Sequence, residues 1–79
     1  MKGFPSTIEV ENIKKRYTKG DRIRLTADME SERFVAGDEG TCRGVDDAGH
    51  VMMAWDKGGS LSLIPEVDSF IIVKKAEVN

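Results

Sequence analysis

The side chains in this sequence that could do chemistry are few, and the clearest group consists of three carboxylates. Asp46 and Asp47 stand just before Gly49, and Asp56 follows one strand later. Such a group could hold a hard cation weakly or act as an acid and base pair. Asp beside glycine is also ordinary hairpin chemistry, because the carboxylate accepts hydrogen bonds from its own turn. We favour the turn interpretation.

One histidine and one cysteine are the other candidates for catalysis. His50 could be a general base, but we find no Ser, Cys or acid at a motif spacing from it. Cys42 could be a nucleophile, although reactivity requires an accessible, electropositive setting. A solvent-facing His50 and a buried Cys42 are the favoured interpretations. A lone cysteine also excludes an internal disulfide, and with only one histidine beside it a four-ligand Cys/His zinc site is excluded as well. The sequence therefore indicates no catalytic residue, no metal and no cofactor.

Basic residues gather between positions 14 and 24. Residues 1–26 hold seven Lys and Arg against three Asp and Glu, whereas residues 27–79 hold five against eleven, for a net charge of −2. The cluster could follow a nucleic-acid backbone, but cations also suit the last turn of a helix, and one aromatic is little for base stacking. The candidate nucleic-acid-binding residues are Lys14, Lys15, Arg16, Lys19, Arg22 and Arg24.

Aromatic side chains suggest a protein-binding groove as another candidate site. The candidate residues for this groove are Tyr17, Phe34, Met52 and Trp55. The alternation of the surrounding strand favours a core position for Trp55 instead. We expect the first contact with a partner on the exposed side of that strand, at Met52 and Ala54, together with the loop 27–37.

These residues must be positioned by a helix and a set of short strands. Ser6 to Glu9 matches a capping box, and Phe4 could pack on Val10 as a hydrophobic staple. The sequence predicts a helix over 7–17 with one apolar stripe, formed by Val10, Ile13 and Tyr17. From residue 22 the apolar period falls to two, which predicts strands at 22–26, 41–45, 50–56, 60–63 and 68–74.

Turns and loops separate the predicted strands. Glycine-containing turns are expected at 37–40, 46–49 and 56–59, a bulge at Gly44, and a 3₁₀ turn at 64–67. The loop 27–37 would be anchored by Phe34 and Val35. The predicted core consists of Ile23, Leu25, Cys42, Val45, Val51, Met53, Trp55, Leu61, Leu63, Phe70 and Ile72.

Five short strands at this size cannot bury one apolar face as a flat layer. The sequence therefore predicts a mainly β fold, a small five-stranded SH3-like barrel with an N-terminal α-helix. We expect one domain, in which a helix at 1–19 packs on a barrel at 20–75 and a frayed tail covers 76–79. A core this small is often helped by a second copy, so a homodimer stays open.

Several segments together resemble a known family. They are residues 19–25, 40–41, 45–51, 55–61 and 67–70, and the VDDAG and WDKGGSL turns are the most specific. In this order the chain is similar to domain-of-unknown-function family 4314 over about residues 5–73. The resemblance implies a small bacterial or mobile-element protein without an established activity. Residues 64–66 depart from the aromatic and glycine that the family tends to carry there, so a groove at this turn would differ.

A function follows from these observations as an expectation. We expect a non-catalytic binding or assembly module whose partner is another protein or a second copy. The alternative is a nucleic-acid-binding accessory protein that uses residues 14–24. The start lacks the apolar region of a signal peptide, and no apolar run approaches the ~20 residues of a membrane span. A lone cysteine suits a reducing compartment, so a cytoplasmic location away from membranes is predicted.

Overall fold

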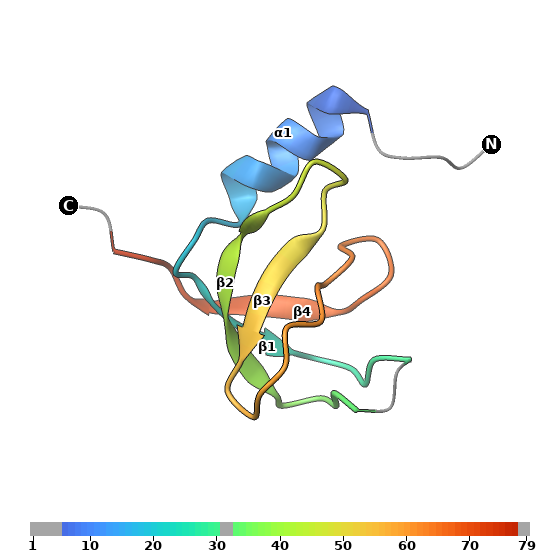
Figure 1. The fold of residues 1–79 in the computed structure, drawn as a ribbon, viewed down its shortest axis with the longest axis vertical. Helices are drawn as coiled ribbons and strands as arrows, with labels where there is room; N and C mark the ends of the chain where they lie inside the picture. Colours follow the sequence, from blue (N-terminus) through green and yellow to red (C-terminus); the bar gives the residue numbers. More distant parts are fainter. Residues whose placement is uncertain (1–5, 31–32, 78–79) are drawn as a thin grey trace.

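A computed structural model describes residues 6–30 and 33–77. One helix, α1 (Thr7–Arg16), precedes four strands: β1 (Arg22–Leu25), β2 (Glu39–Val45), β3 (Val51–Trp55) and β4 (Phe70–Lys74). The strands form one antiparallel sheet in the order β3-β2-β1-β4 (Figure 1). The mainly β class with an N-terminal helix is therefore confirmed.

One of the five predicted strands, the one at 60–63, does not form in the described part of the chain. Residues 60–63 make a single bridge, in which Leu63 and Val51 exchange two hydrogen bonds of 2.8 Å. The indole N–H of Trp55 donates to the Leu61 carbonyl at 2.8 Å. This side-chain hydrogen bond uses the carbonyl that a β-ladder with β3 would have needed. A closed barrel is not confirmed either, because β3 and β4 are the two edges of the sheet.

The helix forms as its sequence predicts. Glu9 N–H donates to the Ser6 hydroxyl at 3.2 Å and Ser6 N–H donates to the Glu9 carboxylate at 3.1 Å, which completes the capping box. The apolar stripe packs on the sheet, with Val10 buried and both Ile13 and Tyr17 half-buried. The proposed staple residue Phe4 lies outside the described residues.

The core lies on one face of the sheet. The loop 27–37 contributes Met29 and Phe34, and the Phe34 ring stands 4.9 Å from that of Trp55. Val35 of the same loop is exposed, so its predicted anchoring role is wrong, as is the inward position of Leu61, which is 43% exposed. The buried cluster consists of Ile23, Leu25, Met29, Phe34, Cys42, Val51, Met53, Trp55 and Leu63, with Val45, Phe70 and Ile72 half-buried against it.

A bulge in β2 confirms the role expected for Gly44. Cys42 pairs with Met53 and Gly44 pairs with Met52, so Arg43 is the extra residue in the ladder. Gly44 has φ of 122°, a backbone conformation that strongly favours glycine. The bulge leaves the Arg43 side chain exposed beside β3.

The opposite face of the sheet carries charge. In alternation with the core residues, β1 and β2 expose or half-expose Arg22, Arg24, Glu39 and Thr41, while the edge strands expose Met52, Ala54, Ile71 and Val73. In the described part of the chain, no helix is long and apolar enough to cross a membrane.

Candidate functional site

A shallow pocket of about 350 Å³ lies beside β3. Two contacts hold the chain segment 59–63 along this strand, the Val51–Leu63 bridge and the hydrogen bond from Trp55 N–H to the Gly59 carbonyl (3.1 Å). The pocket opens between these contacts and is lined by Arg43, Met52, Met53, Ser60 and Ser62. The pocket is therefore built from β2, β3 and residues 60–63, the segment that does not form a strand.

The lining combines apolar, polar and cationic groups. Met52 is 36% exposed, and thioether side chains adapt to irregular apolar ligands. Leu61 stands between the two lining serines in the sequence and is 43% exposed, but it does not line the pocket. Among the residues that the structure describes, no carboxylate pairs with Arg43. An apolar group with a neighbouring carboxylate fits this chemistry best.

Three of the six candidate nucleic-acid-binding residues are engaged in ion pairs. Lys14 lies 3.4 Å from the Asp47 carboxylate. On the outer face of the sheet, Arg22 donates to Asp56 at 2.8 Å and Arg24 donates to Glu39 at 2.8 Å. These hydrogen bonds lower the pKa of the Asp56 and Glu39 carboxyls below their ordinary values. Both carboxylates therefore stay ionised and offset the positive charges of the two arginines.

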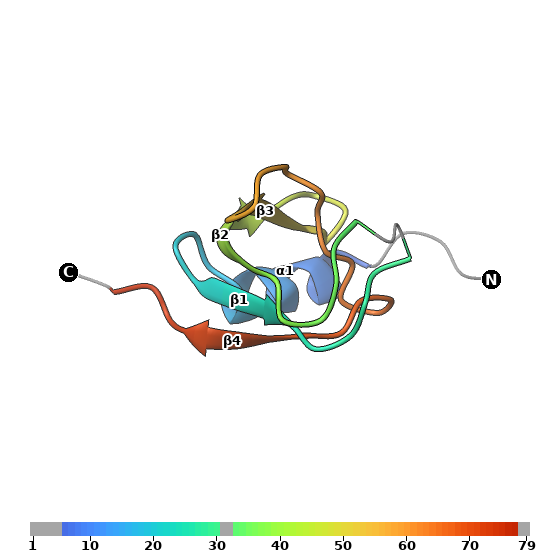
Figure 2. The ribbon, with the colours of Figure 1, turned by 90° about the horizontal axis from the view of Figure 1, so that it is seen from below.

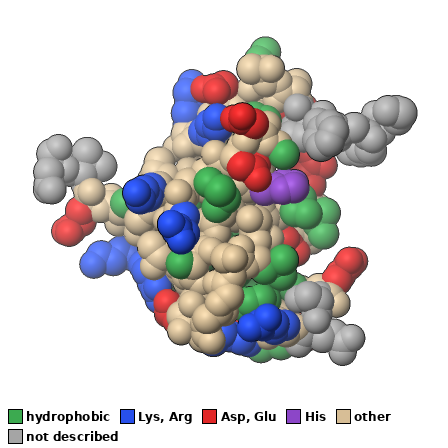
Figure 3. All heavy atoms as spheres, viewed as in Figure 1, with side chains coloured by type: hydrophobic (Ala, Val, Ile, Leu, Met, Phe, Trp, Pro, Cys, Tyr) green, Lys and Arg blue, Asp and Glu red, His purple; other side chains and the backbone are tan. Residues whose placement is uncertain are grey.

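The other three cations of that segment, Lys15, Arg16 and Lys19, are exposed. The hydrogen bond from Gly20 N–H to the Cys42 carbonyl (2.8 Å) draws the turn after α1 to β2, next to Arg43. Figure 3 shows Lys and Arg side chains gathered on the side of the molecule where α1 leads into β1 in Figure 1. The predicted 14–24 segment therefore has three cations in ion pairs and three exposed cations, and these exposed three, with Arg43, are called the basic end below.

The four candidate protein-binding residues do not lie together as an open groove. Phe34 and Trp55 are buried against each other in the core, and Tyr17 is half-buried with its ring 5.3 Å from that of Phe70. The Lys57 ammonium lies 5.2 Å from the Phe34 ring centroid. Only Met52 belongs to the pocket beside β3.

The three carboxylates considered as a cation or acid and base site, Asp46, Asp47 and Asp56, have structural roles. Asp46 accepts from the N–H groups of Ala48 and His50, both at 2.9 Å, and so caps its hairpin. Asp47 and Asp56 belong to the ion pairs described above. Within residues 6–30 and 33–77, no group of three or more His, Cys, Asp or Glu side chains is arranged to hold a metal ion.

The two lone candidates for catalysis also have structural surroundings. The Nδ1 atom of His50 lies 3.8 Å from an Asp46 carboxylate oxygen. Cys42 is fully buried, and its sulfur accepts from Gly44 N–H at 3.3 Å. Burial raises the pKa of the Cys42 thiol, so the nucleophilic thiolate is disfavoured.

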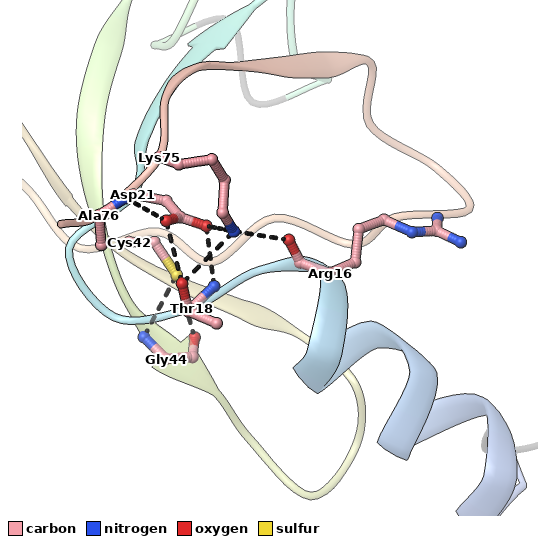
Figure 4. A network of polar contacts seen from close by, with 7 residues as sticks. All are labelled: Arg16, Thr18, Asp21, Cys42, Gly44, Lys75 and Ala76. Carbon is pink, nitrogen blue, oxygen red and sulfur yellow. Dashed lines mark hydrogen bonds and ion pairs between the residues drawn. The ribbon is translucent and has the colours of Figure 1, made fainter. Parts of the chain in front are cut away.

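A buried carboxylate that the sequence analysis did not identify joins the two ends of the domain (Figure 4). Asp21 accepts from Thr18 N–H (2.9 Å) and the Thr18 hydroxyl (3.0 Å), and after β4 from the Lys75 ammonium (2.7 Å) and Ala76 N–H (2.8 Å). Burial alone would raise the pKa of Asp21, but these hydrogen bonds outweigh it and lower the pKa below its ordinary value. Ala76, expected in the frayed tail, is thereby held in place.

A comparison with protein families gives one result. The family described as a domain of unknown function, DUF4314, matches residues 6–73. That range contains every residue that lines the pocket. No curated protein matches the sequence.

Proposed function

Because this chain belongs to the DUF4314 family, whose description names no activity, its own surface must suggest a role, and we propose a non-catalytic protein-binding module. The pocket beside β3 is the docking site. The observation that carries this proposal is a concave site in which exposed Arg43 lies beside Met52 and Met53 and pairs with no carboxylate of the described residues.

The partner segment is apolar and acidic. An apolar side chain would fill the pocket against the methionines, and a neighbouring carboxylate would form a charge-assisted hydrogen bond with Arg43. Ser60 and Ser62 offer hydroxyls that both donate and accept, so main-chain groups of a bound segment would find partners there. Hot spots of this kind combine an apolar anchor with arginine.

Nucleic-acid binding is the second candidate, and the basic end supports it. Lys15, Arg16 and Lys19 are exposed there, near the arginine at the β2 bulge. The ion pairs of Lys14, Arg22 and Arg24 argue against the longer basic stripe, because those cations already face carboxylates. Such binding would weaken steeply with salt.

Two finer points belong to the same proposal. The sheet is an opened relative of an SH3-like barrel, in which a fifth strand at 60–63 would extend the sheet at the β3 edge where Leu63 now makes one bridge. The protein works in a reducing compartment such as the cytoplasm, since Cys42 is a free, buried thiol.

Short fluorescent peptides with one leucine flanked by aspartates test the docking site. We expect the wild-type protein to bind them and to ignore peptides with lysines in place of the aspartates. Arg43→Glu should weaken binding at least about tenfold, because a hydrogen bond to a charged group contributes about 1.5–3 kcal/mol. Fluorescence anisotropy measures the affinities.

Lys15→Glu is the matched control, since it reverses one exposed charge outside the pocket. It should leave peptide binding unchanged and weaken any binding to oligonucleotides at low salt. If Arg43→Glu and Lys15→Glu lowered the peptide affinity equally, the loss would follow from the change in net charge, and the pocket would not be the docking site.

A further inference from the structure

The strand β4 forms an edge of the sheet that nothing in the described chain covers. Figure 2 shows β4 on the outside, with β1 between it and β2. Its sequence is Phe70-Ile71-Ile72-Val73-Lys74. Among the described residues, only β1 pairs with the main chain of this strand. The opposite edge differs, because the segment 59–63 lies along β3.

Main-chain groups of β4 point to this open edge. Thr26 N–H donates to the Ser69 carbonyl at 2.9 Å, and Leu25 N–H donates to the Asp38 carbonyl on the other side of β1. Since the directions alternate along an antiparallel ladder, Ile71 faces β1, while Phe70 and Ile72 direct their N–H and C=O groups outward. The bulge opposite Arg22 and Ile23 lies past Ile72 and leaves these pairs regular.

The regular part of this edge, residues 69–72, lacks the usual protections of an edge strand, because the bulge and Lys74 come only after Ile72. Natural edges carry proline, inward charges, bulges or a covering loop, because an open ladder templates pairing with another chain. Residues 69–73 contain neither proline nor charge. Ile71 is 47% exposed and Val73 is 37% exposed on the outer face. A strand of β-branched residues with this exposure favours a partner strand.

We propose that two copies of this chain pair through β4, antiparallel, about a two-fold axis at Ile71. In that register Phe70 of each copy lies opposite Ile72 of the other, so the four outward groups of each copy form main-chain hydrogen bonds across the axis. The two Ile71 side chains pack together as a close cross-strand pair. Beyond the regular part, the Lys74 end of each strand lies toward the Asp68 end of the other.

The strand complements itself, which is why a second copy is the occupant. It has aliphatic residues at its centre, Asp68 before it and Lys74 at its end. An antiparallel copy brings these unlike charges to the same end of the contact, whereas a parallel copy would bring like charges together. The contact is short against the ~1,600 Å² of a standard interface, so we expect a dimer that forms in the micromolar range.

Sedimentation velocity from about 5 µM to about 500 µM measures this association. The wild-type protein should shift from monomer to dimer over the series. Ile71→Lys should remain monomeric, because it places two like charges directly opposite each other. Ile71→Glu by itself should also remain monomeric. An equimolar mixture of Ile71→Lys and Ile71→Glu should form a dimer again, because it places unlike charges opposite each other. Both substitutions are at an exposed site, so circular dichroism should show an unchanged fold.

Met52→Lys is the matched control at the other edge, where it adds the same charge to a position that is 36% exposed, against 47% for Ile71. It should dimerise like the wild-type protein while losing the peptide binding proposed for the pocket, so the two proposals fail separately. A wild-type protein that stays monomeric at the highest concentration, or an Ile71→Lys variant that still dimerises, would overturn the inference.

Discussion

Replacing Asp21 by alanine should cost about 3 kcal/mol or more of unfolding free energy, enough to leave much of the protein unfolded. The carboxylate is fully buried and accepts four hydrogen bonds, so its removal leaves two main-chain N–H groups and the Lys75 ammonium without their acceptor. Urea unfolding at neutral pH measures the loss. Asp47→Ala is the control, since Asp47 makes its ion pair in full solvent, and it should leave the urea midpoint almost unchanged.

The same carboxylate makes the fold sensitive to acid. The pKa of Asp21 is lower in the folded protein than its ordinary value of 3.8, so the unfolded chain takes up the proton first. Its contribution is complete above that ordinary value and is lost as the pH falls through it toward the folded pKa. Asp21→Asn should therefore be less stable than wild type at pH 7, with the difference shrinking below about pH 4. An unchanged difference across that range would show that Asp21 does not carry this dependence.

Gly40→Ala should cost about 3 kcal/mol, the second large effect that we expect. Gly40 sits in β2 where β3 approaches closely, and an added Cβ would stand 2.8 Å from the Ala54 carbonyl oxygen and 3.0 Å from the Trp55 Cα. Both atoms are main chain, so β3 itself would have to move. That movement would also disturb the pocket, which β3 lines with Met52 and Met53. Thermal and urea unfolding measure the cost.

Gly37→Ala separates this steric effect from backbone strain. Gly37 has φ of 97° and open space where a Cβ would stand, so alanine should cost only the left-handed backbone penalty of about 1 kcal/mol. Equal losses in the two variants would mean that the close approach of β2 and β3 is not what selects glycine at position 40.

Local patterns predicted the parts of the fold that local physics decides. The capping box at Ser6, the hairpin at Asp46 and the bulge at Gly44 each follow from a residue and its near neighbours. The alternation in β3 correctly placed Met53 inside and Met52 outside. In these elements propensity, turn chemistry and burial favour the same structure, so sequence reasoning succeeds.

Contacts between distant segments account for the failures. Residues 60–63 alternate like a strand, but the Trp55 indole N–H forms a hydrogen bond with the Leu61 carbonyl, which is then not available to a strand neighbour. The alternation of apolar residues gives no sign of this hydrogen bond. Met29 lies in a loop without any period and was not predicted in the core, where it packs beside Phe34, the loop anchor that was predicted. An alternating pattern indicates which side chains are apolar. Tertiary contacts determine which main-chain N–H and C=O groups stay available for pairing with a neighbouring strand.

The candidate site shows the same division. Met52 could be predicted as exposed from alternation alone. Arg43 was missed because only the bulge turns it toward the pocket, although Gly44 was a usable signal. Asp21 was missed because its ammonium partner, Lys75, is 54 residues away, and the one local signal is the Thr18 spacing three residues before it.

The central claim is that this module binds an apolar, acidic protein segment at the pocket beside β3. Titrating ¹⁵N-labelled protein with the leucine–aspartate peptide, and separately with a single-stranded oligonucleotide at low salt, tests it by mapping amide shifts. We predict that the peptide shifts the amides of Arg43, Met52, Met53, Ser60 and Ser62, and that the oligonucleotide leaves them in place. Shifts caused only by the oligonucleotide, at Lys15, Arg16 and Lys19, would contradict the claim.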